Sequence, residues 1–174
     1  MIMRQLLVGF AVYGAAVVAA ADEVTIDMRA VSVDGVGESI GTVTASDSPG
    51  GLVLTPALTG LSPGVHGFHV HQNPDCGPAM KDGQAVAGLA AGGHFDPLGL
   101  AKHKGPHAHG HMGDLPALEV AADGTASTPV VAPRLTVANI RGRSLMIHAG
   151  GDNYSDDPSP LGGGGARVAC GVIQ

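Results

Sequence analysis

The sequence is poor in basic residues, contains no tryptophan and has no segment patterned like a long helix. Over residues 22–174, 8 basic residues stand against 15 acidic ones, a net charge of −7. This balance argues against nucleic acid as a partner, because nucleic acids are bound by basic surfaces. A small anionic substrate would need a locally positive approach. No stretch repeats apolar residues every three or four positions between helix caps, so we do not expect a helical fold.

Only one long apolar run is present, and it lies at the start of the chain. It extends from Leu6 to Ala21, follows the basic residue Arg4 and leads directly into Asp22 and Glu23. An uncleaved membrane anchor is the alternative, because the run is about the length of a membrane span. Small residues directly before two acidic ones favour a secretory signal peptide over residues 1–21. The mature domain would then be 22–174, with no membrane attachment after cleavage.

Cysteine occurs only twice, at Cys76 and Cys170. An exported chain matures in an oxidising compartment, where an even number of cysteines suggests one disulfide. Two separate buried thiols are the alternative. The bridge would close a loop of roughly 95 residues, which the chain-entropy model values at about 4–5 kcal/mol.

Short β-branched segments alternate with turns rich in glycine, of which the chain has 28 residues. Long irregular loops in a compact domain are usually functional. Two such stretches, 72–116 and 149–166, hold most of the histidines, one cysteine and a glycine tract. The pattern predicts an all-β sandwich or barrel that carries two large loops. The expected strands are 24–33, 41–44, 52–58, 65–71, 118–122, 127–131, 144–148 and 167–173.

The motif GFHVH, residues 67–71, predicts a pair of metal ligands on a strand. Successive side chains of a strand point to opposite faces, so His69 and His71 share one face, with Cα atoms about 6.6–7 Å apart. Both imidazoles can then reach one metal ion. A His-x-His pair also occurs on surface strands, but Phe68 and Val70 supply a core-facing side here. His66 falls on the core side, and we interpret it as a structural histidine.

A second pattern begins with GGHFDP, residues 92–97, and continues into the run HKGPHAHGH. Three histidines and a carboxylate suit a closed tetrahedral zinc site. Such a site would hold an otherwise irregular loop in place. Solvated loop histidines are the alternative. The candidate ligands, separated by nine, eight and three residues, are His94, His103, His111 and Asp114.

Two further motifs flank the second irregular stretch. In MIHAGGD, His148 ends an apolar strand, and Asp152 follows four residues later. A carboxylate there could accept hydrogen bonds from metal-bound imidazoles and orient them, although an ordinary turn aspartate is equally compatible. In GGGGAR, which leads into the last strand, the glycines place Arg167 at the edge of the second long stretch, where a guanidinium could dock a small anion. A plain surface arginine is the alternative.

Taken together, the order and spacing of these motifs resemble those of the exported bacterial copper,zinc superoxide dismutases. The resemblance extends from Asp27 to Gln174. It implies an eight-stranded Greek-key β-barrel with a zinc loop and an electrostatic loop, located in the periplasm. It also implies that superoxide is converted to dioxygen and hydrogen peroxide with one copper and one zinc per subunit, either in a monomer or in a homodimer. A non-catalytic relative would lack copper ligands or the arginine, and this sequence keeps both.

The resemblance also assigns roles to individual residues. Asp152 would link His69 to His103, and Arg167 would position superoxide. His94 would bridge the two metals and hold a proton for the departing peroxide. His107 and His109 match no ligand position, so we expect them to be solvated. The implied sets are copper at His69, His71, His94 and His148; zinc at His94, His103, His111 and Asp114; and a disulfide between Cys76 and Cys170.

Overall fold

The computed structural model describes residues 22–174, so the predicted signal peptide lies outside the described residues. No helix within this range is long and apolar enough to cross a membrane. Strands dominate, as the sequence predicts. The elements are β1 (Glu23–Ser32), β2 (Gly35–Ser48), β3 (Gly51–Leu58), β4 (Gly64–His66), β5 (Phe68–His71), β6 (Ala79–Lys81), β7 (Gln84–Val86), η1 (Leu89–Ala91), β8 (Leu118–Val120), β9 (Val130–Ala132), α1 (Val137–Ile140), β10 (Arg143–His148), η2 (Leu161–Gly163) and β11 (Arg167–Ile173).

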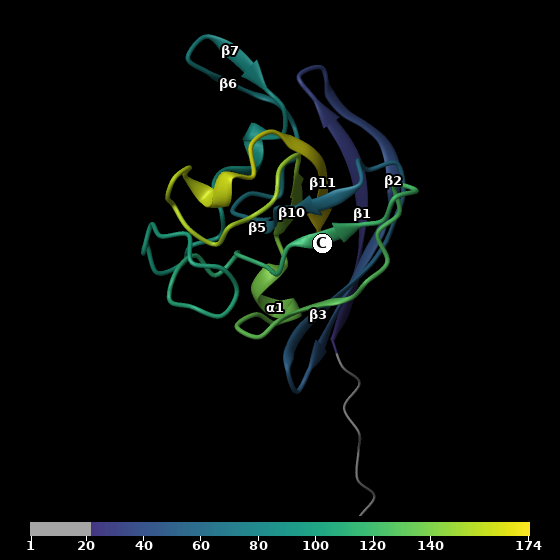
Figure 1. Ribbon diagram of the computed structural model, residues 1–174, viewed down its shortest axis with the longest axis vertical. Coiled ribbons are helices and arrows are strands. Elements are labelled where there is room, and N and C mark those ends of the chain that lie inside the picture. The colour runs from purple at the N-terminus through teal and green to yellow at the C-terminus, as the bar shows by residue number, and fades with distance from the viewer. Residues whose placement is uncertain (1–21) are drawn as a thin grey trace, which may run out of the picture.

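The strands form a curled antiparallel sheet (Figure 1). Seven of them pair in the order β5-β10-β11-β1-β2-β3-β9, and β4 pairs with β8. β4 leads into β5 with only Gly67 between them, so the two act as one strand of an eight-stranded barrel. The circle closes through a tight turn after β8, where Ala121 donates to the carbonyl of Thr125 and Ala126 bridges to Leu58 of β3. β3 and β4 are separated in this circle by β9 and β8, as in a Greek key.

The interior of the barrel follows from strand alternation. In β3 every second residue faces inward, which buries Leu52, Leu54 and Leu58 while their neighbours face outward. Period-two alternation of this kind is the pattern of a strand with one buried face. Phe68 and Val70 of β5 also lie in this core, fully buried. Their neighbours on β5 therefore point to the opposite side of the strand.

The sequence prediction differs from the structure in several local details. The expected strand 65–71 is divided at Gly67, whose amide donates to the carbonyl of Gly150 and whose carbonyl accepts from the amide of His148. The chain therefore changes its pairing partner there, from β8 to β10. β2 is longer than expected because it pairs with β1 from Gly35 onward. The prediction of an irregular first loop is wrong for the β6–β7 hairpin, and the short helix α1 was not expected.

The two long loops lie on one side of the barrel, in teal to green and in yellow in Figure 1. We call residues 72–116 the first long loop and residues 149–166 the second. A disulfide joins Cys76 of the first loop to Cys170 of β11, with their Cα atoms 5.7 Å apart, which confirms the predicted pairing. Because the bridge connects residues 94 positions apart, it constrains the unfolded chain and stabilises the fold by roughly 4–5 kcal/mol on the chain-entropy model.

Candidate metal centre

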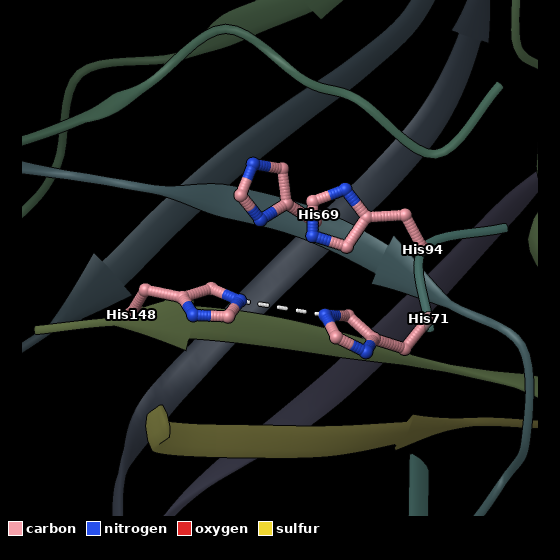
Figure 2. A group of neighbouring side chains, drawn as sticks. All are labelled: His69, His71, His94 and His148. Atoms are coloured by element: carbon pink, nitrogen blue, oxygen red, sulfur yellow. Dashed lines mark hydrogen bonds between the residues drawn. The ribbon is translucent and has the colours of Figure 1, made fainter. Parts of the chain in front are cut away.

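Four buried histidines meet beside β5 and β10 (Figure 2). His69 and His71 lie on β5, and the pairing of β5 with β10 brings both near His148 at the end of β10. The Nε2 atoms of His71 and His148 are 3.4 Å apart. His94 comes from the first long loop, and its ring stacks on His69 with centroids 3.9 Å apart. One ring nitrogen from each of the four lies within 4.8 Å of the others.

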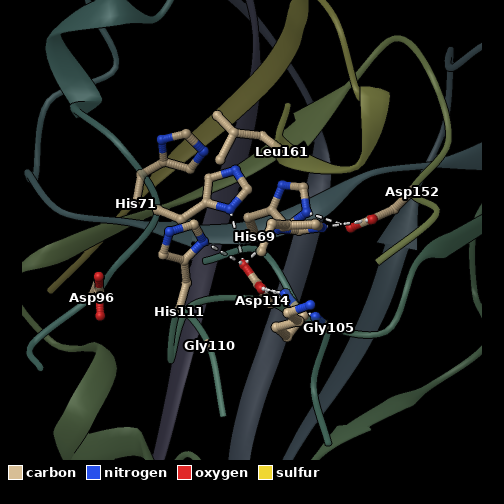
Figure 3. A network of polar contacts seen from close by, with 12 residues as sticks. His69, His71, Asp96, Gly105, Gly110, His111, Asp114, Asp152 and Leu161 are labelled. Carbon is tan, nitrogen blue, oxygen red and sulfur yellow. Dashed lines mark hydrogen bonds and ion pairs between the residues drawn. The ribbon is translucent and has the colours of Figure 1, made fainter. Parts of the chain in front are cut away.

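A second group adjoins the first and shares His94 with it. Asp114 lies at its centre (Figure 3), with Oδ1 at 2.9 Å from His94 Nδ1, 3.0 Å from His103 Nδ1 and 3.4 Å from His111 Nδ1. The same carboxylate accepts hydrogen bonds from the amides of Lys104 and Gly105 at its other oxygen. The predicted ligand spacing therefore brings four polar side chains to one buried point.

Several ring nitrogens in these groups lack a hydrogen-bond partner among residues 22–174. A buried polar atom without a partner is costly, and such atoms are rare in folded proteins. Here they converge on the centres of the two groups, where a metal ion would bind them. Four imidazoles suit Cu(II), and three imidazoles with one carboxylate suit zinc, so the residues fit both metals. The atoms without a hydrogen bond are His69 Nδ1, His94 Nε2, His103 Nδ1 and His111 Nδ1; the last two lie close to Asp114 Oδ1 but do not have hydrogen-bond geometry.

Asp152 links the two groups from the second long loop. Its Oδ2 accepts from His69 Nε2 at 2.7 Å and its Oδ1 accepts from His103 Nε2 at 2.7 Å. A partner of this kind fixes the tautomer and orientation of a ligating imidazole. His69 and His103 therefore present Nδ1 to the two group centres. This is the contact that the family resemblance implied for Asp152, which spacing alone had left open.

Backbone carbonyls orient the other two rings of the first group. His71 Nδ1 donates to the carbonyl of Gly92 at 2.9 Å, and His148 Nδ1 donates to the carbonyl of Gly165 at 3.2 Å. Both rings consequently present Nε2 to the interior of the group. Gly92 has a φ of 76°, a left-handed conformation that favours glycine, and it holds this carbonyl in place.

Burial and charge together prepare the groups for cations. Burial lowers the pKa of His69 to about 3 and that of His148 to about 4, so both imidazoles are neutral and available as ligands at pH 7. Burial also acts to lower the pKa of His103, but its close contacts with the carboxylates of Asp114 and Asp152 outweigh it and raise this pKa to about 9. Burial acts to raise the pKa of Asp114. Its contacts with His103 and His94 outweigh burial and hold the pKa of this carboxyl well below its usual value. Positive charge is therefore favoured between these carboxylates.

Arg167, the first residue of β11, lies beside the first group rather than free on the surface. Its two terminal nitrogens donate to the carbonyls of Gly88 at 2.6 Å and Gly92 at 2.7 Å, and the side chain is half-buried. The carbonyl of Gly92 also accepts from His71. A single backbone oxygen thus fixes the guanidinium relative to an imidazole of the first group.

The remaining histidines fall outside both groups. His66 is buried, with one ring nitrogen 2.7 Å from the carbonyl oxygen of His148 and the other 2.8 Å from that of Ser62. It therefore has a structural role, as predicted. His107 and His109 are exposed at the tip of the first long loop, also as predicted.

Sequence reasoning missed three residues that hold the long loops. Asp156 Oδ2 accepts from the amide of His103 at 2.9 Å, which connects the second long loop to the first. Tyr154 Oη accepts from the amide of Ala117 at 3.0 Å, and its ring packs on Gly105. Arg134 donates to four carbonyls of the first long loop. Turn residues and surface arginines are common, so no spacing in the sequence distinguishes them.

The fold is a β-barrel, and two adjoining groups of buried histidines share His94. This arrangement is that of a protein class with two neighbouring metal sites. Residues 39–173 match the family model described as copper/zinc superoxide dismutase. The chain belongs to the copper/zinc superoxide dismutase family. It is an enzyme that converts two superoxide anions and two protons to dioxygen and hydrogen peroxide, with copper and zinc as its metals.

Close bacterial relatives support the family assignment. Superoxide dismutase [Cu-Zn] 2 of Salmonella typhimurium is 57% identical over 150 residues, which cover 86% of this chain and 87% of the relative. Superoxide dismutase [Cu-Zn] of Brucella abortus is 52% identical over 173 residues, covering 99% of this chain and 100% of the relative. The solved Cu/Zn superoxide dismutase from Brucella abortus superposes with a TM-score of 0.87 at 55% identity, covering 88% of this chain and 100% of that one. The fold is accordingly that of the family.

Proposed function

We propose that the first group holds the catalytic copper and the second holds zinc, with His94 shared between them. This assignment rests on one observation: buried ring nitrogens that form no hydrogen bond converge on two adjoining points. The second group has three imidazoles and a carboxylate and no open position, as in a structural zinc site. The proposed ligands are His69, His71, His94 and His148 for copper, and His94, His103, His111 and Asp114 for zinc.

Copper, when bound, supplies the one-electron exchange with superoxide that side chains cannot provide. Both protons come from solvent, and a side chain of this protein can relay one of them to the reacting oxygen. His94 is held at Nδ1 by Asp114, while its Nε2 faces the first group without another partner. A proton taken up at Nε2 is positioned to pass to the departing peroxide, so His94 acts as a general acid. Nδ1 would face the zinc site together with Asp114, so the ring would stay in place while the proton moves at Nε2.

Arg167 positions the substrate in this proposal. The chain carries a net charge of −7 over residues 22–174, so superoxide needs a local cation near the copper ligands. A guanidinium has five N–H donors, and the carbonyls of Gly88 and Gly92 occupy only part of them. The remaining donors are available to hold an anion beside His71.

The zinc assignment is tested by His111→Ala, with His107→Ala/His109→Ala as the matched control from the same loop. His111 is a proposed ligand, whereas His107 and His109 are exposed at the tip of that loop. Loss of an outer partner of a ligand already costs roughly 10–100-fold in metal affinity, so loss of a ligand should cost more. We expect competition titration to give more than about a 100-fold weaker zinc affinity for His111→Ala and an unchanged affinity for the control. Equal zinc affinity in all three proteins would contradict the assignment.

We also propose that residues 1–21 are a signal peptide and that the mature domain, 22–174, works in the periplasm. The pattern of a basic residue, an apolar run and small residues supports this, and a disulfide is characteristic of an oxidising compartment. The intact mass of the exported protein should correspond to a chain that begins at Asp22. A mass that includes the apolar run would favour an anchor instead.

A homodimer is not needed for the proposed chemistry. Every proposed ligand, Asp152 and Arg167 come from one chain. A solved relative from Salmonella enterica, with 56% identity and a TM-score of 0.80, is described as monomeric; the alignment covers 88% of this chain and 100% of that one. We therefore propose that a single chain forms a complete catalytic unit, whether or not two chains associate.

A further inference from the structure

Arg134 lies between β9 and α1, outside both long loops, yet its side chain bonds to the first of them. Nε donates to the carbonyl of Pro106 at 2.9 Å, and Nη1 donates to that of Gly110 at 3.4 Å. Nη2 donates to the carbonyls of Gly105 at 3.3 Å and His111 at 2.6 Å. One half-buried guanidinium thus bonds to four backbone oxygens.

These four oxygens lie at the two ends of one excursion of the chain. Residues 105–106 lead away from His103, and residues 110–111 return the chain to His111. The amide of His111 also donates to the carbonyl of Lys102 at 2.9 Å. Residues 107–109, between the two ends, are exposed. We call residues 105–106 and 110–111, where the chain leaves and returns, the neck of this small loop. Arg134 therefore joins the two sides of the neck, and the proposed zinc ligands His103 and His111 lie at the two ends of the loop.

The contacts of Arg134 suit a guanidinium and no other side chain. Arg134 forms no ion pair with a carboxylate in the described part of the chain, so its positive charge is met by carbonyl dipoles. Arginine presents five donors in a rigid planar fork, whereas lysine presents three donors from a single point. A lysine at this position keeps the charge but cannot reach oxygens at both ends of the neck together.

We propose that Arg134 is a positioning residue for zinc, which holds His103 and His111 in their places and thereby slows release of the ion. This proposal rests on the proposed zinc ligands. A bound ion leaves when its ligands move apart, and His111 is the ligand whose own carbonyl Arg134 holds. Opening of the neck would let the segment swing outward with His111. Closing it keeps both imidazoles directed at the same point.

The test measures zinc release from the fully metallated, disulfide-bonded protein into an excess of a chromophoric chelator. The variants are Arg134→Gln, which removes the charge and the fork, and Arg134→Lys, which removes the fork alone. The matched control is Arg141→Gln, because Arg141 also donates to backbone carbonyls, those of Glu23 and Gln174, away from the loops. Partners outside the ligand set change metal affinity by roughly 10–100-fold, so we expect zinc release about tenfold or more faster in Arg134→Gln. Arg134→Lys should also release zinc faster than the wild type, and Arg141→Gln should match the wild type.

Two further readouts separate positioning from a general loss of structure. Copper release, measured in the same samples, should keep its wild-type rate, because all four proposed copper ligands lie outside the segment that Arg134 holds. Co(II) placed in the zinc site should show a changed visible absorption spectrum in Arg134→Gln, which reports altered ligand geometry.

Several results would overturn the proposal. The first is zinc release at the wild-type rate in Arg134→Gln. The second is zinc release that is accelerated as much in Arg141→Gln as in Arg134→Gln. The third is an Arg134→Gln protein that releases copper as well as zinc faster than the wild type. If Arg134→Gln does not fold, Arg134→Lys decides alone, and release at the wild-type rate there overturns the proposal. A wild-type protein that holds no zinc would overturn the proposed function together with this inference. A wild type that retains zinc beside unaltered variants overturns this inference only.

Discussion

His71→Ala should abolish superoxide dismutation and leave zinc bound. His71 belongs to the first group only, and its Nε2 lies 3.4 Å from that of His148. Alanine deletes one of the four proposed copper ligands, while all four proposed zinc ligands, including the shared His94, are unchanged. Loss of a residue that only hydrogen-bonds to a metal ligand already lowers metal affinity or activity by roughly 10–100-fold. Loss of a ligand itself should therefore lower the activity per chain by more than about 100-fold. Superoxide consumption and metal content measured on the same sample test this.

The control for this substitution is His109→Ala, a histidine exposed on the first long loop and outside both groups. It should keep wild-type activity and both metals. His148→Ala should reproduce the result of His71→Ala, because it removes the facing imidazole. If His71→Ala retained full activity, the assignment of the first group to catalysis would be wrong. If it lost zinc together with copper, the two groups would not be separable as proposed.

Arg167→Glu should slow the enzyme sharply without removing copper. The substitution deletes the guanidinium fixed at Gly88 and Gly92 and places a negative charge on the approach to the first group. Electrostatic focusing changes association rates by roughly 10–1000-fold, and we expect the loss of activity to fall in this range. Salt screens charges, so added salt should slow the wild type and speed up Arg167→Glu. Activity measured across a series of salt concentrations checks both statements.

Arg29→Glu is the matched control for Arg167→Glu, since it changes the net charge by the same amount. Arg29 is a partly exposed residue of β1 that donates to Asp27 and to the carbonyl of Gly37. Its replacement should leave activity and the salt response close to those of the wild type. Equal losses in Arg29→Glu and Arg167→Glu would mean that overall charge matters and that the position of Arg167 does not.

Strand alternation indicated the His69–His71 pair and loop spacing indicated the zinc set, whereas the full copper set and the roles of Asp152 and Arg167 followed only from the family resemblance. The period of two in β5 is local, so it placed His69 and His71 on the side opposite Phe68 before any fold was known. The distances along the chain between His94 and Asp114 likewise indicated a zinc set. These features are visible in sequence because a metal requires particular side chains at particular separations.

Contacts between distant segments could not be predicted in the same way. The division of strand 65–71 at Gly67 depends on pairing with Gly150 and His148, which are far away in sequence. Arg134 acts through backbone carbonyls, which every residue possesses, so its partners leave no trace in side-chain identity. The β6–β7 hairpin is short and partly exposed, and its strands lack an apolar alternation.

The carbonyl of Gly92 shows how the barrel and the first long loop cooperate. It accepts from His71, a residue of β5, and from Arg167, a residue of β11. Arg167, which we propose positions the substrate, and His71, a proposed copper ligand, therefore share one fixed hydrogen-bond acceptor. Gly92 lies in the segment between Cys76 and the second group, and the disulfide ties this segment to β11. The bridge thus ties the segment that carries Gly92 to the strand that carries Arg167, as well as stabilising the fold.

The central claim is that these two groups of residues form a copper- and zinc-dependent catalyst for superoxide. The most direct measurement is superoxide consumption by the mature wild-type chain loaded with copper and zinc, compared with the same concentration of free copper in the same buffer. We expect one copper and one zinc per chain and consumption far faster than that of free copper, with loss of activity when copper is removed and recovery when it is restored. A fully metallated protein that consumes superoxide no faster than free copper would contradict the claim.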